Sequence, residues 1–238
     1  MDLNKSLAVN HLPVGYRIFI EGDVQDDPTN TAYQHSSGGE IEGNYSKTNC
    51  PICSTQLFPI FKFDHLDQRV LALNLWDLPF LQVLVCPYCF FGYMPYWVWF
   101  QEKQIEVEYE DFDTSYLPPK DESGLEFSYE TVSISLDLLQ ENDYPISNEI
   151  IKAFINRQRE PGIYHQLGGV SPTGDSGQMK CNRCKLEMVF AGVIDSDTEN
   201  VPIYQNEEMV GFLIADCHKL YFYTCKPCHV IGIQRMAC

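Results

Sequence analysis

The sequence has little positive charge. Its 238 residues contain 16 lysines and arginines against 33 aspartates and glutamates, which gives a net charge of −17. A surface this acidic repels phosphate backbones, so we do not expect nucleic acid as a partner. The same charge suits a basic protein partner, and it also suits plain solubility; composition alone does not separate the two.

The sequence also lacks the motifs of common nucleotide-dependent and hydrolytic enzymes. It has no Walker loop, no dinucleotide fingerprint and no His-Glu-x-x-His pattern. No serine or cysteine stands in a context that supplies a histidine base. We therefore expect a binding protein rather than an enzyme.

Export and membrane signals are missing as well. The first 15 residues contain one lysine and no apolar run, so no secretory signal is expected, and thiols in such chains usually stay reduced in the cytoplasm. The stretch Leu78–Phe100 has no charge and the length of a membrane span. Its three prolines, Pro79, Pro87 and Pro95, would break a spanning helix. We expect two buried strands flanking a metal-binding turn here, and no membrane partner.

What the sequence does have is cysteine. Eight of its ten cysteines form four Cys-x-x-Cys pairs, which come as two couples: Cys50/Cys53 with Cys86/Cys89, and Cys181/Cys184 with Cys225/Cys228. Two thiols on a tight turn supply half of a tetrahedral sulfur cage, and a second such turn completes it. The spacing predicts two four-cysteine sites that hold two zinc ions. Cys217 and Cys238 have no such neighbour.

Other interpretations of the thiols remain open. Free cysteines are common in protein cores, and a degenerate site could keep its cysteines after losing its metal. A redox pair would need its first thiol at a helix N-terminus, whereas these pairs adjoin strand-like runs. Zinc knuckles favour glycine after the second cysteine, because the backbone must turn toward sulfur there. The residues at that position are Ser54, Phe90, Lys185 and His229.

The two couples lie in two related segments. Tyr33–Gly39 is similar to Tyr164–Gly169, and each is followed by a polar loop, a cysteine pair and an apolar run that ends in an acid. The offset between the segments is 130 residues at the second glycine, 131 at the first cysteine and 139 at the closing pair. We interpret this order as an internal duplication.

Short β-branched and aromatic runs predict strands at 16–20, 57–63, 82–85, 93–100, 188–194, 210–214 and 220–224. The pattern of Asn148–Arg159 predicts a helix with one apolar stripe. Ser147 can cap this helix and Pro161 ends it. We expect it to connect the two related segments.

An acidic segment lies between the halves. Residues 102–149 contain 14 acids and two lysines, and Ile105–Glu110 alternates apolar with acidic side chains, which predicts a strand with one carboxylate face. The segment is either a solvated linker or a docking surface for a basic protein. In the second interpretation the contact residues are Glu106, Glu108, Glu110, Asp111 and Asp113.

The second segment resembles the YwqG-like family in the order of its motifs. These are Gln166-Leu167-Gly168-Gly169, Pro172, Gln178, the pair Cys181/Cys184 and a closing pair Cys225/Cys228 after a strand. The duplicated layout, over 33–92 and 163–232, is also similar to that of programmed-cell-death-2-like proteins. The resemblance implies two related curved-sheet lobes. It also implies a role as a toxin immunity factor, by the first family, or as a chaperone of a basic ribosomal protein, by the second.

Together these observations predict a β-rich α+β fold. Two lobes, 1–101 and 161–238, would each carry a zinc-ribbon-like site and would be joined by the acidic segment and helix at 102–160. The expected function is a cytoplasmic, zinc-stabilised immunity protein that neutralises a cognate bacterial toxin by direct binding. The alternatives are a chaperone or assembly adaptor for a basic protein, and an enzyme with an open zinc site of three protein ligands and a water.

Overall fold

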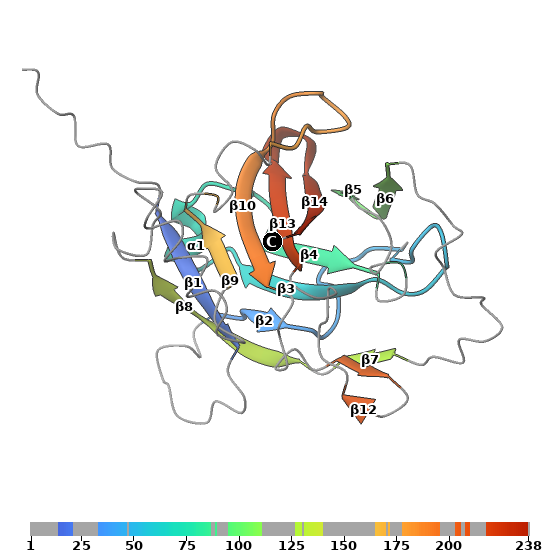
Figure 1. The fold of residues 1–238 in the computed structure, drawn as a ribbon, viewed down its shortest axis with the longest axis horizontal. Coiled ribbons are helices and arrows are strands. Elements are labelled where there is room, and N and C mark those ends of the chain that lie inside the picture. Colours follow the sequence, from blue (N-terminus) through green and yellow to red (C-terminus); the bar gives the residue numbers. More distant parts are fainter. Residues whose placement is uncertain are drawn as a thin grey trace, which may run out of the picture.

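The part of the chain that the structure describes forms a curled, β-rich fold with almost no helix (Figure 1). The computed structural model describes residues 14–20, 33–46, 48–86, 89, 95–110, 127–129, 131–139, 165–169, 171, 178–195, 203–205, 208–209 and 218–237. Within them the elements are β1 (Gly15–Ile20), β2 (Ser36–Ser37), β3 (Phe58–Asp64), α1 (Gln68–Ala72), β4 (Phe80–Val85), β5 (Tyr96–Phe100), β6 (Ile105–Tyr109), β7 (Phe127–Tyr129), β8 (Val132–Leu138), β9 (His165–Gly168), β10 (Val189–Asp195), β11 (Ile203–Gln205), β12 (Glu208–Met209), β13 (His218–Cys225) and β14 (Val230–Ala237).

Most of the strands predicted from apolar runs are confirmed. The runs at 16–20, 57–63, 82–85, 93–100, 188–194 and 220–224 correspond to β1, β3, β4, β5, β10 and β13. The charge-free stretch Leu78–Phe100 supplies β4 and β5, and no described helix is long and apolar enough to span a membrane. The predicted strand at 210–214 and the predicted helix Asn148–Arg159 lie outside the described residues.

Eleven strands form one sheet in the order β4-β3-β2-β8-β1-β9-β10-β13-β14-β5-β6, and β12, β11 and β7 form a small second sheet. The long sheet exchanges strands between the two related segments. β1 precedes the first segment but pairs with β9 of the second, whereas β8 precedes the second and pairs with β2 of the first. β1 and β8 also pair with each other. The prediction of two lobes is not confirmed, because strands of both segments share one sheet.

The acidic segment is not simply a linker. It contributes β6 to one end of the long sheet and β8 to the interior of the sheet, between β2 and β1. In β8, Ile134 and Leu136 are buried, Ser135 between them is half-buried, and Ser133 and Asp137 on either side are exposed. This alternation is what a half-buried strand requires. The division of the chain at 101 and 160 stays a prediction.

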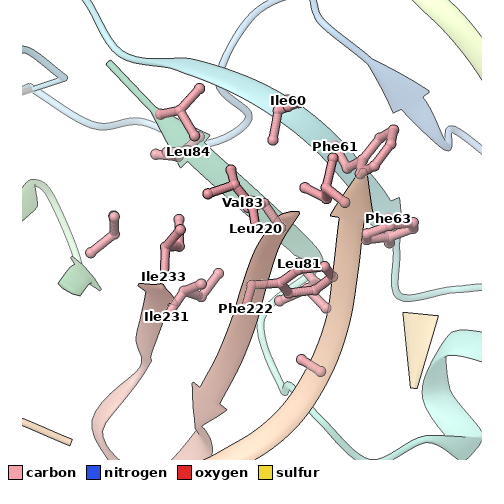
Figure 2. Close-up of a cluster of buried hydrophobic side chains, with 14 of the residues drawn as sticks. Ile60, Phe61, Phe63, Leu81, Val83, Leu84, Leu220, Phe222, Ile231 and Ile233 are labelled. Carbon is pink, nitrogen blue, oxygen red and sulfur yellow. The ribbon is translucent and has the colours of Figure 1, made fainter. Parts of the chain in front are cut away.

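The curl of the sheet brings its distant strands face to face. Figure 2 shows Phe61 of β3 and Val83 of β4 facing Leu220 and Phe222 of β13 and Ile231 of β14. These side chains belong to the larger core, which also includes Tyr96, Val98 and Phe100 of β5 together with the first cysteine group. A smaller core lies on the other face of β5, β13 and β14. It contains Trp97, Met179, Cys181, Met188, Val193, Tyr221, Tyr223, Cys225 and Val230.

Candidate metal centres

The eight paired cysteines come together as two groups of four, in the couples that the sequence predicts. Cys50, Cys53, Cys86 and Cys89 form the first group, and Cys181, Cys184, Cys225 and Cys228 form the second. In each group the four sulfurs lie within 4.8 Å of one another. Cys217 and Cys238 lie outside the described residues.

The first group is buried in the larger core. Cys50 and Cys53 sit on a turn closed by a bridge between Asn49 and Gln56, while Cys86 follows β4 directly. The sulfurs of Cys50 and Cys89 are 3.6 Å apart, and those of Cys53 and Cys86 are 3.4 Å apart. All four side chains are at most 7% exposed, so any charge on them lies away from water.

The second group lies on the opposite face of the sheet and is more open. Its first turn is closed by a bridge between Lys180 and Glu187, the counterpart of the bridge in the first group. Cys225 ends β13, and the sulfur of Cys184 lies 3.6 Å from that of Cys225. Cys184 and Cys228 are half-buried, whereas Cys181 and Cys225 are buried. Solvent and small molecules therefore reach the second group more readily than the first.

Left-handed backbone conformations close the cysteine turns without glycine. Ser54 has φ 63°, Lys185 has φ 62° and His229 has φ 50°. Each follows the second cysteine of a pair, at the position where glycine is favoured. The amide of Ser54 donates to the carbonyl of Cys50, and the amide of Lys185 donates to that of Cys181, both at 2.9 Å. The same turn is therefore built twice, at sites 131 residues apart.

The sulfur geometry fits a tetrahedral ion. Four sulfurs placed 2.3 Å from one such ion lie about 3.8 Å from each other, close to the separations seen here. A disulfide would need about 2.05 Å, so these thiols are not bridged. Backbone amides also support thiolates: Cys89 N–H donates to Cys86 Sγ at 3.3 Å. The N–H of Leu186 lowers the pKa of the Cys184 thiol to about 7. Both groups could hold a metal ion.

The thiols of the buried first group have unequal pKa values. The neighbouring thiol of Cys50 lowers the pKa of Cys53, and the same neighbour raises the pKa of Cys89. One thiolate in such a cluster is thus stabilised by the thiols that remain protonated. Four thiolates at this spacing require a cation between them.

The hairpin of β5 and β6 stands between the two cysteine groups. On one face the hydroxyl of Tyr109 lies 3.4 Å from the sulfur of Cys50. On the other face the indole N–H groups of Trp97 and Trp99 donate to the Lys180 carbonyl at 3.0 Å and the Asn182 side-chain oxygen at 2.9 Å. One short hairpin therefore contacts the surroundings of both groups.

The two residues inside the Cys181-x-x-Cys184 turn make most of the second contact. The guanidinium of Arg183 lies 3.5 Å above the ring of Trp99 and 3.3 Å from a carboxylate oxygen of Glu106. The amide of Asn182 donates to Glu108 at 3.0 Å. Such stacked and charged pairs bring roughly 0.5–1 kcal/mol each at exposed sites.

Two of the predicted partner residues thus already have contacts within the chain. Glu106 is half-buried against Arg183 and Gln104, and Glu108 is exposed but accepts a hydrogen bond from Asn182. Glu110 directly follows β6 and is exposed. Asp111 and Asp113 lie outside the described residues. The sequence alone did not identify Tyr109, Trp97, Trp99 and Arg183 as neighbours of the cysteine groups. The polar residues at 182 and 183, inside the Cys181-x-x-Cys184 turn, could have indicated that this turn packs against another element.

A buried histidine–aspartate pair invites a catalytic interpretation, but its hydrogen bonds point elsewhere. His35 Nε2 lies 2.8 Å from Asp67, and His35 Nδ1 accepts from the Asp64 amide at 3.0 Å. Because Nδ1 is an acceptor, Nε2 carries the proton and donates it to Asp67. Asp67 also pairs with Arg69 at 2.6 Å and caps α1. Both ring nitrogens are engaged, so the pair holds α1 against β2 and β3.

Comparison with protein-family models, with curated proteins and with solved structures finds no match for this chain.

Proposed function

We propose that both cysteine groups bind zinc and that the chain is a zinc-stabilised cytoplasmic immunity protein, which neutralises a cognate toxin by direct protein–protein binding. The observation that carries the proposal is the pair of closed four-thiol groups in a chain of net charge −17. The closed groups favour a structural role for the metal, and the charge favours a basic protein as partner.

Zinc suits these groups better than other common ions. Soft thiolates favour zinc or iron–sulfur centres, and a tetrahedral cage of four cysteines on two short turns is typical of structural zinc sites. Zinc brings no redox chemistry, so it would serve here to join the turns of distant strands. In each group, four sulfurs would fill the coordination shell.

The filled shell argues for binding rather than catalysis. A catalytic zinc keeps one coordination position for water. These groups would offer such a position only if one thiolate dissociated from the ion. The buried His35 supports the same view, because neither of its ring nitrogens is available as a base. We therefore look for function on the surface.

Charge gives the partner its expected chemistry. Electrostatic complementarity speeds association between an acidic and a basic protein and weakens with added salt. The step from a basic protein to a toxin rests on the resemblance to the YwqG-like family. If the toxin is a nuclease, an acidic inhibitor could occupy the surface meant for phosphates.

An affinity capture tests the proposal. The tagged chain is loaded with lysate of its own host, washed at low and then at high salt, and its bound proteins are identified by mass spectrometry. One basic, toxin-like protein that survives high salt and loses its toxicity when bound is the expected result. A ribosomal or assembly protein would favour the chaperone alternative. Absence of any specific protein partner would overturn the proposal.

The captured partner then allows a kinetic test of the acidic segment. Replacing Glu106 or Glu108 would also disturb Arg183 and Asn182, so Glu110→Lys is the cleaner change. We expect it to slow association several-fold and to reduce the salt dependence of the rate. Glu40→Lys makes the same charge change at an exposed loop position after β2 and serves as the matched control. Equal rates for the two variants would remove this segment from the contact.

A further inference from the structure

β6 is the last strand at one end of the long sheet, and among the described residues it pairs only with β5. The direction of its backbone groups follows from the bonds at the hairpin ends. Glu110 N–H donates to the Pro95 carbonyl, and Gln101 N–H donates to the Gln104 carbonyl. Backbone groups alternate sides along a strand, so those of Glu106 and Glu108 face β5. Those of Ile105 and Val107 therefore face away from the sheet.

A hollow of about 680 Å³ runs along this outer edge. Its one wall is the four consecutive residues Ile105–Glu108 together with Trp99, and its other wall is the first cysteine turn with Ser46, Asn49, Pro51 and Ser54. Consecutive strand residues point to opposite faces of a sheet, so a space lined by all four is not confined to one face and extends past the strand edge. Among the described residues the N–H and C=O groups of Val107 have no partner, and Val107 lines this space.

The walls of the hollow have a definite chemistry. Glu106 and Glu108 project on one side of β6, whereas Ile105 and Val107 project toward the larger core on the other. The acidic side already binds a cation of the same chain, since Arg183 pairs with Glu106 and stacks on Trp99. A neighbouring strand would place its alternate side chains about 5 Å from those of β6. Basic residues at alternate positions would therefore meet Glu106 and Glu108.

We propose that the outer edge of β6 binds an extended segment of a partner protein as an additional strand, and that this segment carries lysine or arginine at alternate positions. Main-chain hydrogen bonds to Val107 supply the affinity, and the two glutamates supply the preference for basic residues. The inference rests on the proposed function only for the existence of a basic protein partner. The alternative role for Glu106 and Glu108 is to prevent the edge strands of two molecules from pairing with each other.

Synthetic peptides test the strand geometry directly. The probe is a fluorescent, end-capped heptapeptide that alternates lysine and valine, with two derivatives that are N-methylated either on every valine or on every lysine. In an added strand one set of amides faces β6 and the other faces solvent, so one derivative should lose at least tenfold in affinity while the other keeps it. Equal binding of both derivatives, or no binding of the parent peptide, would overturn the proposal.

Variants of the protein supply the second arm. Val107→Pro removes the outward amide, a change that edge strands tolerate because that N–H makes no bond within the sheet. It should weaken the parent peptide at least tenfold while metal content and melting temperature confirm the fold. Glu108→Gln should weaken binding, whereas Glu187→Gln, an exposed carboxylate outside the hollow, should leave it unchanged. Hydrogen exchange at the Val107 amide should slow when peptide binds; an unchanged rate with tight binding would place the peptide elsewhere.

The two proposals can fail separately. Peptide binding of the expected pattern without a toxin in the affinity capture would retain the edge site and reject immunity. A captured toxin whose affinity is the same for Val107→Pro and the parent protein would retain immunity and reject the edge site.

Discussion

Single residues carry the bends that close the cysteine turns. Ser54 holds a left-handed backbone, which costs a residue with a Cβ atom roughly 1–2 kcal/mol. Ser54→Gly should remove this strain and so stabilise the folded chain. Part of that stabilisation is offset, because glycine also increases the conformational entropy of the unfolded chain. We expect the free energy of unfolding to rise by about 0.5–1 kcal/mol, as measured by denaturant titration with metal bound.

Ser135→Gly is the matched control for this change. Ser135 lies half-buried in the middle of β8, where glycine should lower the free energy of unfolding by about 0.5–1 kcal/mol. The opposite signs distinguish relief of a strained turn from a general effect of glycine. A loss of stability in Ser54→Gly would contradict the interpretation of the turn.

His165 should make the stability depend on pH. Burial, together with the nearby charge of Lys219, lowers the pKa of its imidazole to about 3. An unfolded histidine titrates near 6.5, so below that pH the unfolded chain binds a proton that the folded chain does not bind. The stability is therefore complete above pH 6.5 and is lost as the pH falls toward 3, by up to about 1.4 kcal/mol per pH unit.

Denaturant titrations at stepped pH, on the parent protein and on His165→Gln, measure this effect. Acid also protonates the thiolates of both proteins, so the difference between the two curves isolates the histidine. The slope between pH 6.5 and 3 should be shallower in the variant. Parallel curves would show that His165 titrates equally in the folded and unfolded chains.

The sequence identifies the metal-ligand residues more readily than the residues that contact them. The eight cysteines are recognisable because their ligand type and spacing are local properties of the chain. Tyr109 is not recognisable, because its closeness to Cys50 depends on the pairing of β5 with β14 and not on any neighbour in sequence. Arg183 stacks on Trp99 for the same reason.

Among the elements, the turn between β13 and β14 joins the second cysteine group to the sheet. Cys225 ends β13, and Cys228 lies in the short 3₁₀ turn Lys226–Cys228 before β14. Changing both to serine should remove one of two bound zinc ions and destabilise the smaller core by several kcal/mol, because binding free energy at such sites is folding free energy. Native mass spectrometry counts the ions, and denaturant titration gives the stability.

The corresponding change in the first group, Cys50→Ser with Cys53→Ser, is the comparison. It should remove the other ion and cost more stability, since this group is buried in the larger core. Retention of two ions by either double variant would reject the corresponding metal centre.

β3, β4, β10 and β13 could be predicted because each is a short apolar run. β8 was missed although Val132, Ile134 and Leu136 alternate with polar residues, since it lies in an acid-rich segment that also fits a linker. β2 has only two residues, too few for a period. Which strands pair could not be predicted, because the partners of β1 and β8 lie far from them in sequence.

For the whole molecule, strand exchange predicts that the halves do not fold alone. A fragment of residues 1–101 lacks β8 and β9, the two neighbours of β1, and a fragment of 161–238 lacks β5, the neighbour of β14. Each fragment alone should show little β-structure by circular dichroism and little bound metal. Both signals should return when the two fragments are expressed together with the intervening segment as a third piece. A folded, metal-bound 161–238 fragment would instead support the division into two domains.

The exchange of β1 also sets an order of events on the ribosome. β1 leaves the exit tunnel before its two neighbours, since β8 and β9 are synthesised more than a hundred residues later, roughly 6–30 s at ordinary translation rates. All four cysteines of the first group are synthesised by residue 89, and at that point β1 still lacks both of its neighbouring strands. During that interval β1 is open to the matching strands of a neighbouring nascent chain. Adjacent ribosomes on one message are therefore where this fold is most prone to assemble as an intertwined dimer.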